Sequence, residues 1–273
     1  MNAIRPRSAG HPLRRMWGLF LRHYYVSAGS WTRLVEMIYW PTVQVVIWGF
    51  ITEFLYTNSS FVARAFGVLL AGALLWDILF RGQLGVAVSF LEEIWSRNLA
   101  QLFTSPLRPA EYIASLMALS LVRTLLGLVP AAALASAFFG FNVLELGLSL
   151  IAFFFNLIVM GWAIAMVVCG LVLRYGLGAE NLAWALMFAL APICGIYYPI
   201  DVLPAWLQAV SAGLPASYVF EGMRAVLVER VVRLDLMVYA GLLNLVYLGV
   251  GIGAFVAFFR NARVRGQLVH VGE

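Results

Sequence analysis

Two ionisable side chains interrupt an otherwise apolar stretch near residue 80, and they are the first candidates for chemistry. Asp77 and Arg81 lie four residues apart, which places them one turn apart on a helix. Arg123 lies near the middle of a later apolar stretch, at a similar depth. Charges in such surroundings either pair with one another or face a water-filled path. The sequence leaves both interpretations open: a structural ion-pair network, or side chains that face such a path and contact what it holds.

Metal-ligating and nucleophilic side chains offer little further chemistry. The cysteines Cys169 and Cys194 lie within apolar runs, without the spacing of metal ligands or a disulfide, so we expect them to be small buried hydrophobic residues. The histidines His11, His23 and His270 lie near the termini. No H-E-x-x-H or G-x-S-x-G motif is present. The sequence therefore predicts neither a catalytic site nor a metal site.

All 18 basic residues are arginines, which bears on nucleotide binding. A chain without lysine lacks the G-x-x-x-x-G-K-[ST] loop that holds nucleotide phosphates. We therefore expect no directly bound cofactor, and any chemistry of ATP and Mg²⁺ would belong to a partner. The arginines flank apolar stretches instead of forming a stripe, which is typical of membrane topology and not of a nucleic-acid interface.

The composition indicates which elements hold these residues. Hydrophobic residues make up 63% of the chain, charged residues make up 11%, and the mean hydropathy is +0.91. Several stretches are long enough to cross the roughly 30 Å hydrocarbon core of a bilayer as helices. The sequence therefore predicts an all-α, multi-pass membrane protein with one transmembrane domain over 34–273. Six spans are expected near residues 34–56, 65–90, 111–139, 147–173, 181–199 and 236–259.

Residues 1–33 lack the apolar core and cleavage site of a signal peptide. An apolar set at helical spacing instead predicts a cytoplasmic amphipathic helix in the membrane interface, with Arg15 and Arg22 opposite, towards lipid phosphates. A helix that faces a partner protein is the alternative. The apolar set consists of Leu13, Met16, Trp17, Phe20, Leu21 and Tyr24.

The arginines also predict the orientation of the chain. With the N-terminus inside, many more arginines fall in inner segments than in outer ones, as the positive-inside rule requires. Both termini and the connection after the second span are then cytoplasmic. The segment between the fifth and sixth spans then lies outside.

The stretch EEIWSRNLAQLFTSPLRPAEY, residues 92–112, follows the second span. Its start fits an amphipathic helix over 92–103, and Pro106 and Pro109 stop that helix before the next span. An amphipathic helix in water can dock into a groove of another protein. An ordinary solvated connection is the other interpretation.

Aromatic residues mark the segment between the fifth and sixth spans. Tyr197 and Tyr198 precede Pro199, and Trp206 lies in a short helix that begins at Pro204. These rings could stack against sugars or amphiphiles that move outward, but aromatic residues also populate any membrane interface. A substrate contact and a plain aromatic belt both stay open.

A second amphipathic helix is predicted over about 216–233. Glu221 and Arg224, as well as Glu229 and Arg233, have the spacing of ion pairs on this helix. Short helices of this kind cannot span a bilayer, but a re-entrant hairpin can dip into one. On these residues alone, such a hairpin is an interfacial cap that closes the bundle.

Two of these segments resemble the ABC-2-type transporter permeases. LEEIWSRNLAQLFTSPLRPAEYIAS is similar to the first cytoplasmic loop of that family, which has an E-x-x-x-x-x-x-L-x-x-L-x-x-S-P-L-like stretch before the third span. YYPIDVLPAWLQAVSAGLPASYVFEGMRAVL resembles the family's pattern of Y-P, L-P-x-W-L and an E-x-x-R pair. The order of the two motifs, the N-terminal helix and the six-span layout extend the resemblance over nearly the whole chain.

The resemblance implies a permease subunit of an ABC exporter in a bacterial inner membrane. It implies a homodimer that recruits two cytoplasmic ATPase subunits, with 92–105 as the coupling helix and the hairpin as the outer gate. The family's substrates include polysaccharides, lipid-linked glycoconjugates, drugs and other amphiphiles. The residues expected to contact the ATPase are Glu92, Glu93, Trp95, Arg97, Leu99 and Leu102, with Glu93 and Arg97 at the rim of its groove. The residues expected at the outer gate are Tyr197, Tyr198, Pro199, Pro204, Trp206, Glu221 and Arg224.

A secondary transporter driven by an ion gradient is the alternative function. Such proteins often contain internal repeats, and no convincing repeat relates residues 34–139 to 147–259. Activity that survives ATP depletion but collapses with the proton gradient would favour this alternative. A membrane-embedded enzyme is the least supported class, because the chain offers so little candidate chemistry.

Overall fold

The computed structural model describes residues 12–58, 67–98, 101 and 108–264, and every regular element in these ranges is a helix. Five of these helices have the length and the apolar composition needed to cross a membrane. The five are α2 (Trp31–Asn58), α3 (Val68–Trp95), α5 (Pro109–Phe139), α6 (Ser149–Tyr175) and α10 (Leu234–Val264). The prediction of an all-α protein with several apolar helices is confirmed.

Shorter elements connect and cover these long helices. The short α-helices are α1 (Pro12–Ala28), α7 (Leu182–Leu190), α8 (Ala205–Ser211) and α9 (Pro215–Arg224). Single turns of 3-10 helix are η2 (Val143–Leu146), η3 (Gly176–Ala179) and η4 (Ile200–Val202), and η5 (Ala225–Glu229) is a π-helical turn that continues α9.

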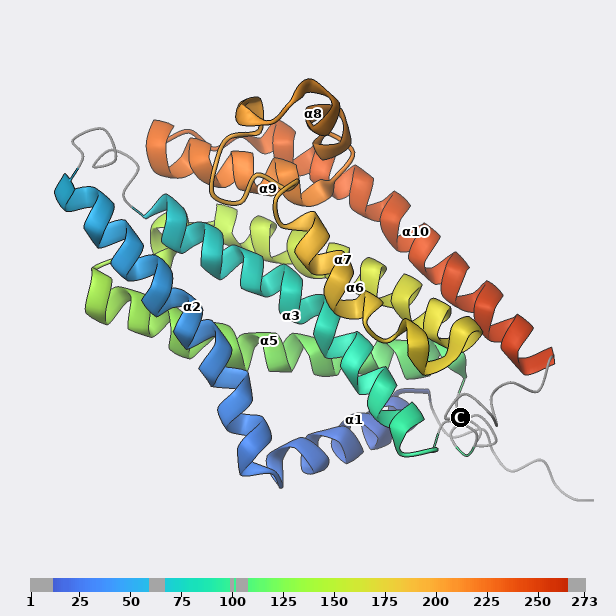
Figure 1. The fold of residues 1–273 in the computed structure, drawn as a ribbon. Coiled ribbons are helices and arrows are strands. Elements are labelled where there is room, and N and C mark those ends of the chain that lie inside the picture. The colour runs from blue at the N-terminus through green and yellow to red at the C-terminus, as the bar shows by residue number, and fades with distance from the viewer. Residues whose placement is uncertain (1–11, 59–66, 99–100, 102–107, 265–273) are drawn as a thin grey trace, which may run out of the picture.

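The long helices form a bundle in which α3 is central (Figure 1). α3 packs against α2, α5 and α6, and α6 packs in turn against α10. A Cβ at Gly161 of α6 would lie 2.7 Å from the carbonyl oxygen of Leu79 on α3, so the two backbones meet where only glycine fits. α2 and α10 lie at the edges and keep much of their apolar surface exposed, as helices in contact with lipid do.

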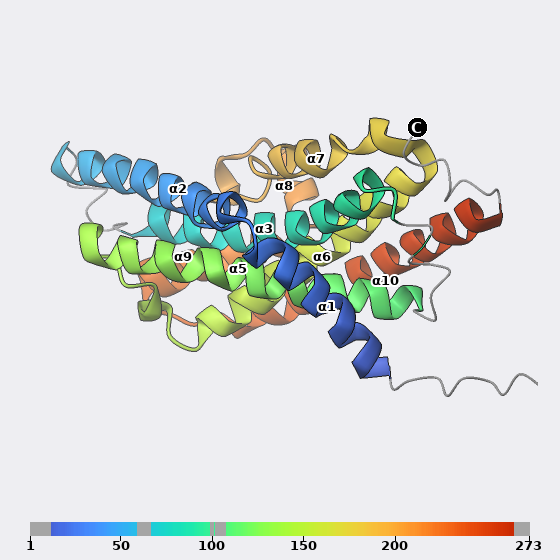
Figure 2. The ribbon, with the colours of Figure 1, turned by 90° about the horizontal axis from the view of Figure 1, so that it is seen from below.

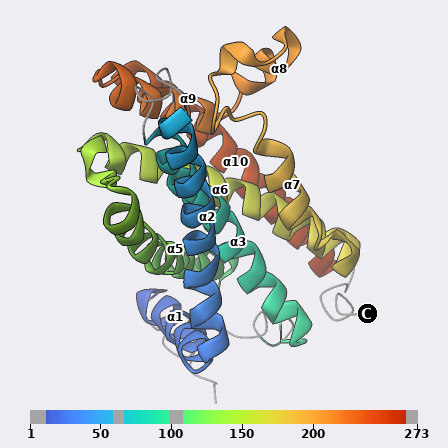
Figure 3. The same ribbon diagram turned by 60° about the vertical axis from the view of Figure 1, so that its left-hand side comes forward.

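The bundle has two ends, which Figure 3 shows below and above. The α1 end comprises α1, the starts of α2 and α5, and the C-terminal ends of α3, α6 and α10. The hairpin end comprises residues 195–235, which include α8 and α9. α1 lies across the ends of α3 and α5 (Figure 2), where it packs mainly against α5.

The predicted spans differ in how they relate to the helices. Five of them each lie along one long helix: 34–56, 65–90, 111–139, 147–173 and 236–259. The fifth predicted span, 181–199, is not a continuous helix, because α7 ends at Leu190 and residues 191–198 form turns. A nine-residue helix rises only about 14 Å, which is less than the hydrocarbon thickness.

The segment that contains α7 nevertheless runs along most of α3. The indole Nε1 of Trp95 donates a hydrogen bond to Glu180 at one end of α3. At the other end, a Cβ at Gly72 would lie 2.9 Å from the carbonyl oxygen of Ile196. The stretch of α3 from residue 72 to residue 95 is about 35 Å long, at the rise of an α-helix. The segment therefore covers the length of a span as a short helix followed by turns.

The helix predicted over 92–103 does not begin at residue 92 as a separate element. α3 continues through Trp95, so Glu92 and Glu93 belong to its last turn, and the chain then turns at residues 96–98. Gln101 is helical and exposed. The predicted ATPase contacts Leu99 and Leu102 lie outside the described residues.

The predicted pair of short helices is present at the hairpin end as α8 and α9. α9 is largely buried against α6 and α10, so this part of the segment enters the bundle. The helix predicted over 216–233 ends at Glu229, because Arg230 has a left-handed backbone with a φ of 57°. The predicted pair of Glu229 with Arg233 is therefore wrong as a pair on one helix, and Arg233 instead lies 2.6 Å from Asp235.

Candidate functional site

Three side chains in the last turn of α3 each contact a different element. The carboxylate of Glu92 lies 3.9 Å from a guanidinium nitrogen of Arg123 on α5. Glu93 contacts α1. The indole Nε1 of Trp95 donates to a carboxylate oxygen of Glu180, just after η3, at 3.1 Å. The end of α3 is therefore connected through side chains to α1, α5 and the segment that precedes α7.

Glu93 is only 2% exposed, and its carboxylate accepts hydrogen bonds from the side chains of Arg22 and Asn98. Oε1 lies 3.0 Å from Nη1 of Arg22 and 3.2 Å from Nε2 of His23. Oε2 accepts a hydrogen bond of 3.0 Å from the side chain of Asn98. The prediction that Glu93 lies at the rim of an ATPase groove is wrong, because its carboxylate is buried against α1 and the turn that ends α3.

Arg15 connects α1 to α5 in a similar way. Its Nη2 and Nε donate to the two carboxylate oxygens of Glu111 at 2.6 and 3.0 Å. Glu111 also accepts from the backbone nitrogen of Arg108 and so caps the start of α5. The hydrogen bond to Glu111 raises the pKa of Arg15, so the guanidinium stays charged. Arg15 and Arg22 thus bind two carboxylates of the bundle, not lipid phosphates as predicted, because those carboxylates lie directly beneath α1.

The opposite face of α1 is aromatic and exposed. The rings of Trp17 and Phe20 stack with their centroids 5.3 Å apart, and Phe20 and Tyr24 stack at 6.5 Å. Leu13, Trp17 and Tyr24 are exposed. An amphipathic helix with such a face fits the predicted location in a membrane interface.

α3 ends in a Schellman motif whose left-handed position is occupied by Arg97. The backbone nitrogen of Arg97 donates to the carbonyl of Ile94, and that of Asn98 donates to the carbonyl of Glu93, both at 2.9 Å. Glycine usually fills this position, and another residue with a φ of 55° costs about 1 kcal/mol. Trp95 is 51% exposed and Arg97 is exposed, so this corner of the chain is open to a partner.

Of the three charges predicted to form one network within the spans, Asp77 and Arg81 pair with each other, and Arg123 contacts Glu92 and Ser89. Asp77 and Arg81 form an ion pair of 2.5 Å on α3, and Asp77 is buried. A Cβ at Gly127 of α5 would lie 3.0 Å from the guanidinium carbon of Arg81, so glycine makes room for this side chain. Arg123 lies nearer the α1 end, where it donates to the hydroxyl of Ser89 at 2.9 Å.

Glu221 and Arg224 form the predicted ion pair, at 2.7 Å, and also bind the turns that follow α7. Arg224 donates to the carbonyl oxygen of Gly195 at 2.6 Å, and Glu221 accepts from the backbone nitrogen of Ile200 at 3.0 Å. Gly195 has a left-handed φ of 64°. Backbone groups outside a helix need other partners within a membrane, and this ion pair supplies them.

Two of the three aromatic residues predicted at the outer gate make contacts within the chain. The ring of Tyr197 stacks on Trp48 of α2, with centroids 3.9 Å apart. The hydroxyl of Tyr198 donates to the carbonyl of Pro192 at 2.5 Å. Trp206 of α8 is 68% exposed. Tyr197 therefore joins the segment after α7 to the first long helix, and Trp206 stays accessible.

The prolines of this segment lie at the ends of short helices. Pro199 precedes η4 and Pro204 precedes α8, and both are exposed. The side chain of Gln208 closes the turn between them by donating to the carbonyls of Leu203 and Asp201, at 2.8 and 3.2 Å.

Several partners of the site residues were not found from the sequence. Arg15 and Arg22 lie about two turns apart, and Glu93 and Glu111 flank the charged stretch, so complementary pairs could have been inferred from the charges. Nothing in the sequence connects Trp48 with residue 197, because that contact depends on how the bundle packs.

A bundle of several helices that are long and apolar enough to cross a membrane defines a multi-pass membrane protein. The family model described as "ABC-2 type transporter" matches residues 27–228, so the chain belongs to the ABC-2 type transporter family. It is therefore an ABC-type transporter permease, a membrane transport component of a family that generally works with an ABC ATPase subunit. The predicted family is confirmed. A search of the curated proteins gave no match.

Proposed function

We propose that this chain is the membrane-spanning subunit of an ATP-driven exporter in a bacterial inner membrane. Two copies of a cytoplasmic ATPase subunit would bind ATP and Mg²⁺, and the permease would bind no cofactor itself. The substrate would be an amphiphile, a lipid-linked glycoconjugate, a polysaccharide or a drug-like compound. The observation that carries this proposal is the match to the ABC-2 type transporter family over most of the chain.

The α1 end would be cytoplasmic, together with both termini. Arginines outnumber acidic residues there, and the hairpin end has fewer of them, as the positive-inside rule requires. The described arginines at the α1 end are Arg14, Arg15, Arg22, Arg33, Arg97, Arg108, Arg174, Arg260 and Arg263, and those at the hairpin end are Arg224, Arg230 and Arg233.

The corner after α3 would be the contact with the ATPase. Trp95 offers an exposed apolar anchor, and Arg97 offers a charge beside it. A groove in a partner recognises such a combination, because the apolar group supplies burial and the charge fixes the register. The side-chain contacts of the last turn of α3 would then pass a displacement on to α1, α5 and the segment before α7.

Replacing Trp95 and Arg97 together by alanine tests this contact. The double variant should lose the ATPase subunits that co-purify with the wild-type permease in detergent, and transport should fall with them. Trp206 and Arg230 provide a matched control at the hairpin end, because they are also an exposed tryptophan and an exposed arginine with a left-handed backbone. ATPase association unchanged in the Trp95/Arg97 variant would refute the coupling role.

A second copy of the chain would pack beside α2 and the segment that contains α7, so that these elements line the path. α2 exposes large side chains such as Phe50 and Phe54, and Trp48 links it to Tyr197. The native cysteines are buried, which leaves introduced ones free for cross-linking. Phe50→Cys should cross-link between copies, whereas Leu245→Cys, on the exposed face of α10, should not. The reverse pattern would place the dimer contact on α10.

The hairpin of α8 and α9 would gate the outer end of this path. Its turns are held by the ion pair of Glu221 and Arg224, and α8 remains exposed. A disulfide between the end of α8 and α10, where the hydroxyl of Tyr247 donates to the carbonyl of Gly213 at 3.0 Å, should stop transport reversibly if α8 moves. It should leave transport unaffected if the hairpin is only a cap.

The pair of Asp77 and Arg81 would be structural. Both side chains are occupied by each other, and Arg81 is enclosed by α5. Asp77→Asn should therefore reduce the amount of folded protein in the membrane. Normal assembly with lost transport would instead assign this pair to the substrate path.

A further inference from the structure

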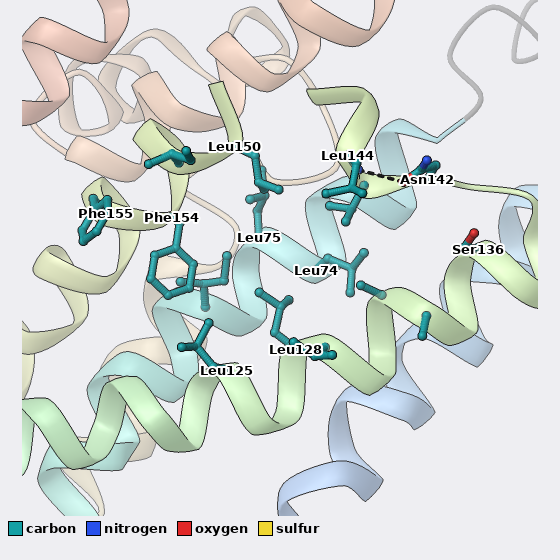
Figure 4. Close-up of a pocket in the computed structure, with 16 residues that line it drawn as sticks. Leu74, Leu75, Leu125, Leu128, Ser136, Asn142, Leu144, Leu150, Phe154 and Phe155 are labelled. Carbon is teal, nitrogen blue, oxygen red and sulfur yellow. Dashed lines mark hydrogen bonds between the residues drawn. The ribbon is translucent and has the colours of Figure 1, made fainter. Parts of the chain in front are cut away.

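α5 and α6 follow one another in the chain, yet each packs along α3 and not closely against the other. A pocket of about 610 Å³ lies between them (Figure 4). Its floor is made by Leu74, Leu75 and Ile78 of α3, which are buried. The volume lies within the range of about 300–1,000 Å³ that is usual for ligand sites.

The pocket opens sideways, between the exposed faces of α5 and α6. Val129 of α5 and Ile151 and Phe155 of α6 line it and are themselves exposed. Both helices have the length and composition of membrane spans. The opening therefore lies where the protein would meet the acyl chains of the bilayer.

The two ends of the pocket differ in polarity. Ser136 and Asn142 lie at the end formed by the C-terminal part of α5 and the start of η2 (Figure 4). Asn142 accepts a hydrogen bond from the backbone nitrogen of Leu144, which fixes that rim. Leu125 and Phe154 line the other end, deeper along the helices, and the lining there is entirely apolar.

A water-filled pocket does not fit this lining. A buried water needs two to four polar partners, and the side chains around the floor provide none. Empty apolar cavities bind hydrocarbon where it is available. In a bilayer the hydrocarbon next to the opening belongs to lipid, whose polar head lies at the membrane surface and whose tail points inward.

We propose that this pocket binds one acyl chain of a membrane phospholipid. The chain enters between α5 and α6, its carboxyl end lies near Ser136 and Asn142, and its methyl end lies near Leu125 and Phe154. The site is separate from the transport path proposed above, which α2 and the segment with α7 would line. A bound chain fills the space between two helices that otherwise meet mainly through α3.

Photo-labelling of the full chain tests this site. The permease is reconstituted in vesicles of phosphatidylethanolamine and phosphatidylglycerol that contain phosphatidylcholine with a diazirine at the methyl end of one acyl chain. After irradiation, the label should concentrate on residues 125–129 and 151–155, above its level on the exposed face of α10 at 242–250. A diazirine near the carboxyl end of the chain should move the label to residues 136–142.

A variant that fills the pocket provides the control. Ala133 lines the pocket and Ala137, one turn further along α5, is exposed outside it. Ala133→Trp should abolish the excess label and the phospholipid that native mass spectrometry finds bound after delipidation, whereas Ala137→Trp should retain both. Ile151→Trp at the opening replaces Ala133→Trp if that variant does not elute as folded protein. Equal labelling of the pocket and α10, or an excess that survives filling in a folded variant, would show contact with bulk lipid only and overturn the proposal.

Discussion

The two ends of the bundle use ion pairs in different ways. At the α1 end, Glu93 and Glu111 bind arginines that lie 71 and 96 residues away in the sequence. At the hairpin end, Glu221 and Arg224 lie three residues apart and bind backbone groups of the turns between α7 and α8. The first arrangement joins separate helices, and the second supports a stretch of chain that is not helical.

This difference separates two mechanical roles. An ion pair between helices makes the movement of one depend on the other, so a force applied after α3 reaches α1 directly. An ion pair that completes the hydrogen bonds of a turn fixes a local shape and transmits little. We therefore expect changes at the α1 end to spread to other helices, and changes at the hairpin end to stay local.

The largest loss of stability is expected from Glu93→Ala. The substitution leaves Arg22 and Asn98 without their buried acceptor, which should lower the free energy of unfolding by about 3 kcal/mol. Equilibrium unfolding in detergent measures this loss, and hydrogen exchange should rise in α1 as well as in α3. Glu145→Ala, at an exposed position of η2, is the matched control and should change little. A Glu93 variant as stable as that control would remove the basis for a link between α1 and α3.

A smaller loss of stability, confined to the hairpin end, is expected from Arg224→Met. The substitution leaves the carbonyl of Gly195 without its donor and the carboxylate of Glu221 without its cationic partner, which should cost about 2 kcal/mol. Hydrogen exchange should rise in residues 195–204 and stay unchanged in α1. Arg233→Met removes an exposed arginine from its pair with Asp235 and should have little effect. Faster exchange in α1 would contradict the local role of this pair.

The sequence predicted the long helices well, because each carries an apolar run that only a membrane-spanning helix explains. It predicted the pairs of Asp77 with Arg81 and of Glu221 with Arg224, because their spacing on one helix brings them together. It did not predict the break after α7, because residues 181–199 carry no charge and were assigned to one span, although Pro192 and Gly195 are residues that commonly end a helix. The burial of Glu93 was missed because its partners belong to α1.

A modest loss of stability is expected from Trp95→Phe. Phenylalanine keeps the apolar surface but removes the indole donor that binds Glu180, so stability should fall by about 1 kcal/mol or less at this exposed site. If the exposed ring is the anchor for the ATPase, association should persist in this variant, whereas Trp95→Ala should weaken it. Equal association in the phenylalanine and alanine variants would remove the ring from the interface.

The smallest change in stability is expected when each arginine with a left-handed backbone conformation is replaced by glycine. This pair of substitutions also gives the closest comparison of the two ends. Arg97 and Arg230 have φ values of 55° and 57°, and both are exposed. Glycine adopts this conformation without strain, so Arg97→Gly and Arg230→Gly should each stabilise the protein, by about 1 kcal/mol at most. Only Arg97→Gly should weaken ATPase association, because only Arg97 lies at the proposed contact. If both variants gain the same stability and only Arg97→Gly loses ATPase association, the arginine at position 97 is needed for its charge despite its strained backbone. Weakened association in both variants would instead assign the effect to a general change in the protein.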